Sequence, residues 1–397
     1  MNEENSTIVI GAGISGSCTA YHLNKAGCDV TVIDEKKEDD IQIYSNPAVC
    51  VYPKIMLNDP NFNKFMLLST EYVWSLIKAL DLKEEYTRKV GAIHLYETKD
   101  GTSRYAKLIK NTSYTARDVE LIDQEVIKKR FGIIDYVGFQ FKKGGWINPK
   151  ALCKKLIEDK NIKKIFSSKI ISVEKVKGYW TILTEDKKMF TAKNIIFCSA
   201  SNIKNYKYFN ALKVDEYRGQ VDWFPNKKNR YKEVLSNDGY VIPDVNEKII
   251  FGSSYEKNNF NTESSQADTV NNINKLKKLM PDLKYSIVDD RIENWVGQRA
   301  ASFDKKPYVG RVLKTRDGLI SPIKYSVEDL DWYEGLFINT CYGSRGFSFA
   351  PLASLSLAKF ITGNLNDEDK FILNYLNPER QYFKKQGIKK KGVSFSL

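Results

Sequence analysis

The sequence is poor in histidine and has no paired cysteines. Of its 397 residues only His22 and His94 are histidines, and they lie in apolar stretches that predict a helix and a strand. A mechanism based on a histidine base or a multi-histidine metal site is therefore not expected. The six cysteines are scattered without a C-x-x-C pair, which excludes a disulfide framework or a zinc ribbon and fits a reducing compartment.

Long hydrophobic runs are also missing. No uninterrupted apolar stretch approaches the ~20 residues that a membrane-spanning helix needs. The first six residues are acidic and lead directly into a strand-like segment, which is not the pattern of a signal peptide. The sequence thus predicts a cytoplasmic protein that does not enter a membrane.

Hydrophobic residues and positive charge are both well represented. The hydrophobic share of 42% predicts a folded globular protein. Lys and Arg number 62 against 49 Asp and Glu, a net charge of +13, and the segment 379–397 carries six basic residues and one acidic residue. Such charge favours polyanionic partners such as nucleic acid. It is equally typical of proteins from a Lys-rich proteome, and the basic segment fits a solvated chain end.

The amino-terminal region contains a G-x-G-x-x-G motif. A buried strand at 7–10 precedes Gly11, Gly13 and Gly16, and a helix to Lys25 follows them. In such a turn the first glycine allows the tight bend, the second lets a pyrophosphate approach, and the third lets helix and strand pack. Asp34 ends the next strand, where a carboxylate accepts from ribose hydroxyls and repels a 2′-phosphate. The motif predicts a dinucleotide other than NADP, and it leaves NAD and FAD open.

Two further constellations accompany this motif. Gly343-Ser344-Arg345-Gly346 follows a buried strand and precedes a helix, so its backbone N–H groups either meet an anion or form a plain tight connection. The guanidinium of Arg299 could donate two parallel hydrogen bonds to a substrate carboxylate, and the hydroxyl of Tyr240 could donate to the same carboxylate. Taken alone, Arg299 also fits a surface ion pair and Tyr240 fits simple packing. No second G-x-G-x-x-G is present, so a reductase with its own NAD(P) domain is not expected.

Periodicity predicts the remaining elements in outline. The expected helices cover 63–82, 148–160, 266–281 and 352–361, and the expected strands cover 90–96, 169–192 as a meander, 195–198, 212–255 as a strand-rich region, and 336–339.

Motifs along nearly the whole chain resemble the glycine oxidase and D-amino-acid oxidase class of flavoproteins, and more narrowly the FAD-dependent half of the MnmC family. They are the residues 9–16, Asn46-Pro47-Ala48, Tyr52-Pro53-Lys54, the residues 144–149, Arg218-Gly219-Gln220, Gly239-Tyr240 with Pro243, Ser254-Tyr255-Glu256, the residues 299–310, Gly343-Ser344-Arg345-Gly346 with Ala350-Pro351-Leu352, and Leu376-Asn377-Pro378 with Arg380. The resemblance implies an α/β fold with an FAD-binding Rossmann-like domain and an interleaved, largely antiparallel substrate domain. The implied FAD-domain segments are 1–85, 143–212 and 300–378, the substrate-domain segments are 86–142 and 213–299, and 379–397 is a basic tail.

The resemblance also implies a chemistry. FAD, held without a covalent bond because Ala300 stands where related enzymes have a tethering cysteine, would oxidise 5-carboxymethylaminomethyl-uridine at the tRNA wobble position. The products would be glyoxylate and 5-aminomethyl-uridine. Arg299 would anchor the substrate carboxylate with help from Tyr240, and Arg345 would lie near the flavin ring. The implied FAD-binding residues are Gly11, Gly13, Ile14, Ser15, Gly16, Asp34, Glu35, Ser45, Asn46, Val173, Gly343, Ser344, Arg345 and Gly346.

The implied partner is the tRNA anticodon loop, because an extruded wobble nucleotide must be reached by a site ringed with phosphate contacts. Candidate contacts are Lys142, Lys143, Lys227, Lys228, Arg230 and the tail lysines. The family's methyltransferase half is not in this sequence, so a separate methyltransferase would act downstream. Two alternatives stay open: a free glycine, sarcosine or D-amino-acid oxidase, and a flavin-containing RNA-binding protein without catalysis.

Overall fold

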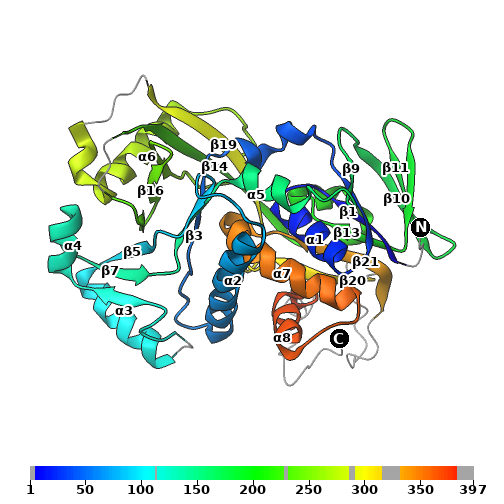
Figure 1. Ribbon diagram of the computed structural model, residues 1–397, viewed down its shortest axis with the longest axis horizontal. Helices are drawn as coiled ribbons and strands as arrows, with labels where there is room; N and C mark the ends of the chain where they lie inside the picture. The colour runs from blue at the N-terminus through cyan, green and yellow to red at the C-terminus, as the bar shows by residue number, and fades with distance from the viewer. Residues whose placement is uncertain (1–4, 112–113, 228–230, 286–290, 315–330, 382–397) are drawn as a thin grey trace.

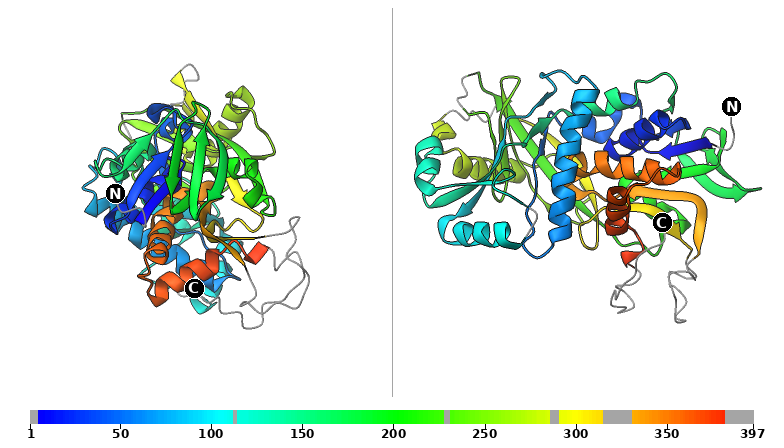
Figure 2. Two further views of the ribbon diagram at one scale, coloured as in Figure 1. Left: turned by 90° about the vertical axis from the view of Figure 1, so that its right-hand side faces the viewer. Right: turned by 60° about the horizontal axis from the view of Figure 1, so that its bottom comes forward.

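Two large sheets organise the molecule, and the chain crosses between them several times (Figure 1). The computed structural model describes residues 5–111, 114–227, 231–285, 291–314 and 331–381. A six-stranded sheet with α1 and α7 occupies one side of the molecule, and a nine-stranded sheet with α3, α4 and α6 occupies the other. Helix α2 lies between the two parts and packs on α7 (Figures 1 and 2).

The six-stranded sheet has the order β20-β21-β13-β1-β2-β9. All neighbours run parallel except β20 and β21. Its strands are β1 (Ser6–Ile10), β2 (Asp29–Ile33), β9 (Lys163–Ile165), β13 (Asn194–Phe197), β20 (Tyr308–Leu313) and β21 (Trp332–Thr340). Since side chains alternate along a strand, Val9 packs with the helices on one face, while Ile8 and Ile10 pack on the three-stranded meander that covers the other.

The second large sheet has the order β18-β14-β17-β16-β15-β5-β7-β6, and β19 also pairs with β14. Its strands are β5 (Ala92–Glu97), β6 (Glu120–Ile122), β7 (Tyr136–Phe141), β14 (Val214–Pro225), β15 (Val234–Ser236), β16 (Tyr240–Val245), β17 (Lys248–Gly252), β18 (Glu256–Lys257) and β19 (Glu293–Ser302). Only the β15–β5 pair is parallel among these. The expected fold class, with a Rossmann-like part and a largely antiparallel part, is confirmed. The division into six segments stays a prediction.

Two small sheets complete the described strands. The meander is β10 (Ile170–Val176), β11 (Tyr179–Thr184) and β12 (Met189–Ala192), and the other is β3 (Val49–Val51), β8 (Gly145–Ile147) and β4 (Thr87–Arg88). The helices are α1 (Ile14–Lys25), α2 (Pro60–Ala79), α3 (Thr98–Asn111), α4 (Gln124–Phe131), α5 (Pro149–Leu156), α6 (Gln266–Leu279), α7 (Gly346–Ile361) and α8 (Asp367–Leu376). In the described part of the chain, no helix is both long and apolar enough to cross a bilayer.

The expected start of α7 was wrong. Because proline lacks an N–H and disfavours a helix interior, the sequence predicted a helix beginning after Pro351, whereas α7 begins at Gly346. The ring of Phe349 packs on the rings of Phe62 and Phe65, at centroid distances of 5.8 and 5.0 Å. This packing against α2 holds the first turns of the helix despite the proline.

Three helices were not predicted, although two carry clear end signals. Helix α4 begins after Asp123, whose side chain accepts from the Val126 N–H, and it ends at Gly132 in the left-handed conformation. Helix α8 begins with a capping box between Asn366 and Asp369. These caps are local patterns, so a search for them would have found both helices.

Candidate functional site

The glycine turn between β1 and α1 uses its three glycines in different ways. Gly11 has φ +101°, and a Cβ there would lie 2.8 Å from the carbonyl oxygen of Cys198. A Cβ on Gly16 would lie 1.7 Å from the carbonyl oxygen of Gly11. At Gly13, by contrast, a Cβ would meet no atom within 4 Å. Gly11 and Gly16 are therefore needed by the fold, while Gly13 keeps space open beside the turn.

Helix α1 presents its amino terminus to this space. Its N-cap residue is Gly13, and no side chain caps it. The first N–H groups of a helix that lack such a cap form a site for an anion such as a phosphate. The turn can thus hold a pyrophosphate, as its sequence predicts.

Asp34, directly after β2, braces the turn. One carboxylate oxygen accepts from the Ala12 N–H at 2.7 Å, and the other accepts from the Lys36 N–H at 2.8 Å. Burial raises the pKa of Asp34, and the two N–H groups act in the opposite direction. The carboxylate lies at the edge of a cavity, with further lone pairs free to accept from a ribose.

This cavity has a volume of about 950 Å³ and is long enough to join the glycine turn to both large sheets. Most of the predicted site residues line it: Gly11, Gly13, Ile14, Ser15, Asp34, Glu35, Asn46, Tyr240, Arg299, Gly343, Ser344, Arg345 and Gly346. Its volume lies at the upper end of the ~300–1,000 Å³ typical of small-molecule and cofactor sites. One cavity therefore connects the dinucleotide motif with the predicted carboxylate-binding residues.

Three predicted residues are not among the described residues that line the cavity. Gly16 packs beneath the turn. Ser45 is exposed at the end of a short 3₁₀ helix, Gln42–Ser45. Val173 is buried on β10, and its carbonyl accepts from the hydroxyl of Tyr208 at 2.8 Å. In that region the segment 168–171 forms the wall instead.

The second glycine turn also lines the cavity, and a Cβ on its Gly346 would lie 3.2 Å from Cγ2 of Ile14 at the start of α1. Gly343 has φ +58°, and a 3₁₀ turn over Gly343–Arg345 leads into α7. The Arg345 guanidinium donates from Nη1 to the carbonyl of Tyr52 at 3.1 Å, and its Cζ lies 5.0 Å from the centroid of that ring. Arg345 is thereby fixed at the cavity wall.

Arg299 carries an unused buried donor. It lies on β19, and its Nη2 donates to the hydroxyl of Ser253 at 3.1 Å. Its other terminal nitrogen, Nη1, is buried and has no hydrogen-bond partner among the described residues. Burial lowers the pKa of Arg299. An arginine that lines a cavity and keeps one terminal nitrogen unpaired fits a carboxylate, which accepts two parallel hydrogen bonds from a guanidinium.

Gly219 makes room for this guanidinium. It lies on β14, which pairs with β19, and a Cβ at Gly219 would lie 1.7 Å from Nη1 of Arg299. The sequence did not identify Gly219 or Ser253 as site residues. Gly219 stood within the motif Arg218-Gly219-Gln220 without an assigned role, because both residues act through Arg299 on a distant strand.

Tyr240 begins β16 and lines the same cavity as Arg299. Burial raises the pKa of Tyr240, and the charge of Arg299 opposes that rise. The phenol therefore keeps its proton at neutral pH and is available as a donor. The cavity thus contains two kinds of hydrogen-bond donor that could bind one anionic group, the phenol of Tyr240 and the guanidinium of Arg299.

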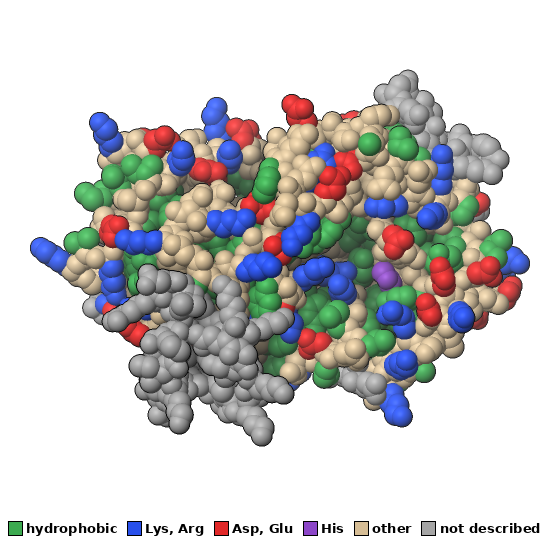
Figure 3. Space-filling model, turned by 180° about the vertical axis from the view of Figure 1, so that it is seen from behind, with side chains coloured by type: hydrophobic (Ala, Val, Ile, Leu, Met, Phe, Trp, Pro, Cys, Tyr) green, Lys and Arg blue, Asp and Glu red, His purple; other side chains and the backbone are tan. Residues whose placement is uncertain are grey.

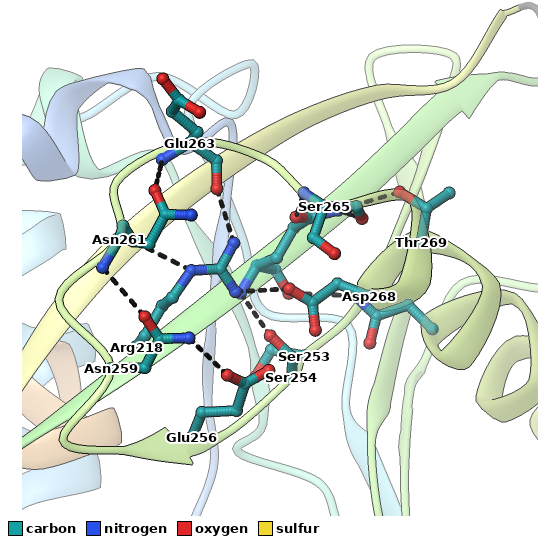
Figure 4. Close-up of polar contacts among 12 residues, drawn as sticks. Arg218, Ser253, Ser254, Glu256, Asn259, Asn261, Glu263, Ser265, Asp268 and Thr269 are labelled. Carbon is teal, nitrogen blue, oxygen red and sulfur yellow. Dashed lines mark hydrogen bonds and ion pairs between the residues drawn. The ribbon is translucent and has the colours of Figure 1, made fainter.

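A buried arginine supports the loop behind Arg299 (Figure 4). Arg218 is 1% exposed, donates to the carbonyls of Asn261 and Glu263 at 2.9 and 2.6 Å, and pairs with Asp268 of α6. Ser253 lies earlier in the chain, in the connection between β17 and β18. Because a buried charge needs several partners, the network fixes the segment 261–268 beside β14.

The fold and cavity define a class of protein: a dinucleotide-dependent enzyme whose cofactor cavity is also lined by Arg299 and Tyr240. The chain belongs to the family described as FAD dependent oxidoreductase, whose model matches residues 6–359. FAD is therefore the cofactor, and the NAD alternative is resolved.

Curated relatives and solved structures agree with this assignment. The tRNA 5-methylaminomethyl-2-thiouridine biosynthesis bifunctional protein MnmC of Methylobacillus flagellatus is 23% identical over 389 residues, and that of Legionella pneumophila strain Lens is 26% identical over 394 residues. Both alignments cover 96% of this chain, and the chain spans about three fifths of these relatives, 60% and 58%. The resemblance stated from the sequence is confirmed.

The fold is shared with glycine oxidase from Bacillus cereus, with a TM-score of 0.74 and 15% identity, covering 92% of this chain and 96% of that one. It is also shared with an iminodiacetate oxidase from Chelativorans sp. BNC1, with a TM-score of 0.74 and 19% identity, covering 91% and 96%.

The residues present fit FAD. The open space at Gly13 and the uncapped start of α1 suit a pyrophosphate, and Asp34 with Glu35 suits a ribose. Ala300 also lines the cavity. That the flavin is held without a covalent bond stays a prediction.

Acid is expected to destabilise the protein through His22. Burial lowers the pKa of His22 from 6.5 to about 3, so the folded state keeps this ring neutral while the unfolded state takes up a proton below pH 6.5. The free energy of unfolding then falls as the pH falls, by about 2 kcal/mol per such histidine between about pH 7 and about pH 5. Urea unfolding of wild type and His22→Gln at both pH values measures this. An equal pH dependence of the two proteins would contradict it.

Proposed function

We propose that this chain oxidises the carboxymethylamino group of 5-carboxymethylaminomethyl-uridine at the tRNA wobble position, giving 5-aminomethyl-uridine and glyoxylate. The observation that carries the proposal is Arg299, which lines the FAD cavity together with Tyr240 and has a terminal nitrogen, Nη1, without a hydrogen-bond partner among the described residues. A carboxylate is the group that a guanidinium binds best. The curated relatives, named for tRNA 5-methylaminomethyl-2-thiouridine biosynthesis, support the choice of a modified tRNA base.

FAD, when bound, accepts the hydride from the carbon between the amine nitrogen and the carboxylate. The nitrogen loses its proton to water, and the resulting imine takes up one water, which breaks the carbon–nitrogen bond to leave glyoxylate and a primary amine. Arg299 binds the carboxylate and so fixes the reacting carbon, and Tyr240 donates to the same carboxylate. No histidine base is required.

The solved structures of the same fold support the substrate group. Glycine and iminodiacetate, named in two of them, both contain a nitrogen–CH₂–carboxylate unit. The wobble nucleoside 5-carboxymethylaminomethyl-uridine contains the same unit, attached to its base. We further propose a cytoplasmic location, where tRNA is found, and a separate methyltransferase that consumes the primary amine.

The proposal predicts that modified tRNA reduces the flavin. Under anaerobic conditions, tRNA from cells that accumulate the carboxymethylaminomethyl base is expected to bleach the flavin absorption band and to release one glyoxylate per flavin reduced. Arg299→Met is expected to lose the reaction while keeping its FAD, because only the carboxylate anchor is removed. Stopped-flow absorbance with a glyoxylate assay measures both.

Other outcomes identify the alternatives. Reduction by free glycine, sarcosine or a D-amino acid, and not by tRNA, would replace the proposal with a small-molecule oxidase. Tight tRNA binding without reduction by any of these compounds would indicate an RNA-binding flavoprotein without catalysis.

A further inference from the structure

Of the residues that the sequence suggested for RNA contact, some are paired with carboxylates in the structure, one is exposed, and the rest lie outside the described residues. Lys142 pairs with Glu120 at 3.0 Å, and Lys143 pairs with Glu71. Their charge is already matched by a neighbouring carboxylate. Lys227 is exposed, whereas Lys228, Arg230 and the tail lysines lie outside the described residues.

A different group of positive side chains lies around Lys54 and Arg345, close enough for their charges to act on one another. None of the ion pairs recorded for the described ranges involves Lys54, Arg104, Lys305 or Arg345. Arg345 lines the cavity, and the other three are exposed. Lys54 comes two residues after Tyr52, whose carbonyl accepts from Arg345. We call these four residues the mouth cations.

Rings on one face of β7 connect Arg104 to this group. The Cζ of Arg104 lies 5.5 Å from the centroid of the Tyr96 ring. Tyr96 packs on Phe139 at 4.6 Å, and Tyr52 packs on Phe141 at 6.3 Å. Since Phe139 and Phe141 are two residues apart on one strand, they point to the same face. Two arginine-on-tyrosine contacts therefore lie side by side.

Lys305 joins the group from the turn after β19. Its neighbour Lys306 pairs with Asp59 at 2.8 Å, in the segment that follows Lys54. The carboxylate of Asp304 is taken by Arg380, at 3.0 Å. The carboxylates of Asp304 and Asp59 are thus already paired with Arg380 and Lys306.

These cations act on one another. Lys54 is exposed as a residue, but its ammonium group is partly buried, which lowers the pKa of Lys54, and the charges of Arg345 and Lys305 lower it further. Burial also lowers the pKa of His94 to about 4, with help from Arg345, Lys54 and Arg104. Like charges gathered without an opposite charge repel, and the repulsion is relieved when an anion binds between them.

We propose that the mouth cations bind the phosphodiester groups of an RNA loop whose nucleotide enters the cavity. The inference rests on the proposed function and assigns the RNA-contacting residues of that site. An extruded nucleotide keeps its flanking phosphates outside the pocket, where exposed cations meet them. Figure 3 shows Lys and Arg side chains gathered along a hollow on the face that it views. Tyr52 and Tyr96 add aromatic faces beside these charges.

The test separates RNA binding from chemistry. The variant Lys54→Gln/Arg104→Gln/Lys305→Gln removes three mouth cations and leaves Arg345 in place. The control Lys175→Gln/Lys207→Gln/Lys248→Gln removes the same charge from lysines paired with Glu334, Glu174 and Glu293. Binding of modified tRNA is measured against salt concentration, and flavin reduction is measured with the tRNA and with the isolated modified nucleoside.

The mouth variant is expected to bind tRNA about 100-fold more weakly than wild type. Log affinity should also fall less steeply with log salt, with a slope smaller in magnitude by about 2, since each lost phosphate contact reduces the slope by ~0.7–0.9. Its reduction by the nucleoside is expected to match wild type. The control variant is expected to change tRNA affinity by less than about 5-fold.

Equal losses in the two triple variants would overturn the inference, because total charge would then explain the binding. A loss with the nucleoside as large as with tRNA would also overturn it, since the cations would then hold the small substrate itself. If wild type binds tRNA with the expected slope but is reduced by neither substrate, the proposed function fails while the phosphate contacts stand.

Discussion

Gly219→Ala is expected to lower kcat/KM for the carboxymethylamino substrate by about 100-fold, although it changes no charge and no cofactor contact. A Cβ at this position would lie 1.7 Å from Nη1 and 2.4 Å from Cζ of Arg299. The guanidinium is the mobile end of a long side chain, so it moves away and the strand keeps its place. Losing a buried charged hydrogen bond costs about 2–5 kcal/mol, and ~2.7 kcal/mol corresponds to 100-fold.

A double-mutant cycle tests this explanation. Steady-state kinetics of Gly219→Ala, Arg299→Met and the double variant are compared at equal FAD content. Because both changes remove the same interaction, the double variant is expected to be no worse than Arg299→Met. Additive losses, or loss of bound FAD in Gly219→Ala, would show that the glycine acts by another route.

Gly219 also marks the limit of sequence reasoning for this site. The turn Gly11–Gly16 with Asp34 could be predicted because strand, turn, helix and acid follow one another within a short stretch of chain. Gly219 is needed because of Arg299, which is 80 residues away in the sequence and comes close only because β14 pairs with β19, where Gly219 is opposite Gly297. A need created by tertiary pairing leaves no local pattern.

The positive side chains illustrate the same point. Lys142 and Lys143 were candidate RNA contacts in the sequence, yet each has a carboxylate partner from a distant segment. Lys54 and Arg104 have no basic neighbour in the sequence and Lys305 has one in Lys306, yet we propose that these three residues act together. Composition predicts how much charge is present, whereas ion pairing decides where it is free to act.

Gly13→Val is expected to weaken FAD binding by about 100-fold without changing the stability of the apoprotein. Gly13 has φ −70° and ψ −174°, an extended conformation that valine also adopts, and no atom lies within 4 Å of the added Cβ. The side chain would project into the space beside the uncapped start of α1. Forcing atoms into a filled site costs ~1–3 kcal/mol, up to about 100-fold in affinity. Titration of the apoprotein with FAD, followed by flavin fluorescence, measures the affinity.

Gly11→Val provides the contrast, because the two glycines lie in one turn and differ in what surrounds them. At Gly11 the φ of +101° and the carbonyl of Cys198 at 2.8 Å both oppose a side chain. This variant is expected to lose thermal stability as an apoprotein as well as FAD. If Gly13→Val also lowered the melting temperature of the apoprotein, or kept its flavin, the open space at Gly13 would not be where the pyrophosphate binds. A loss of FAD alone at Gly13, and of both properties at Gly11, assigns the first glycine to the fold and the second to the cofactor.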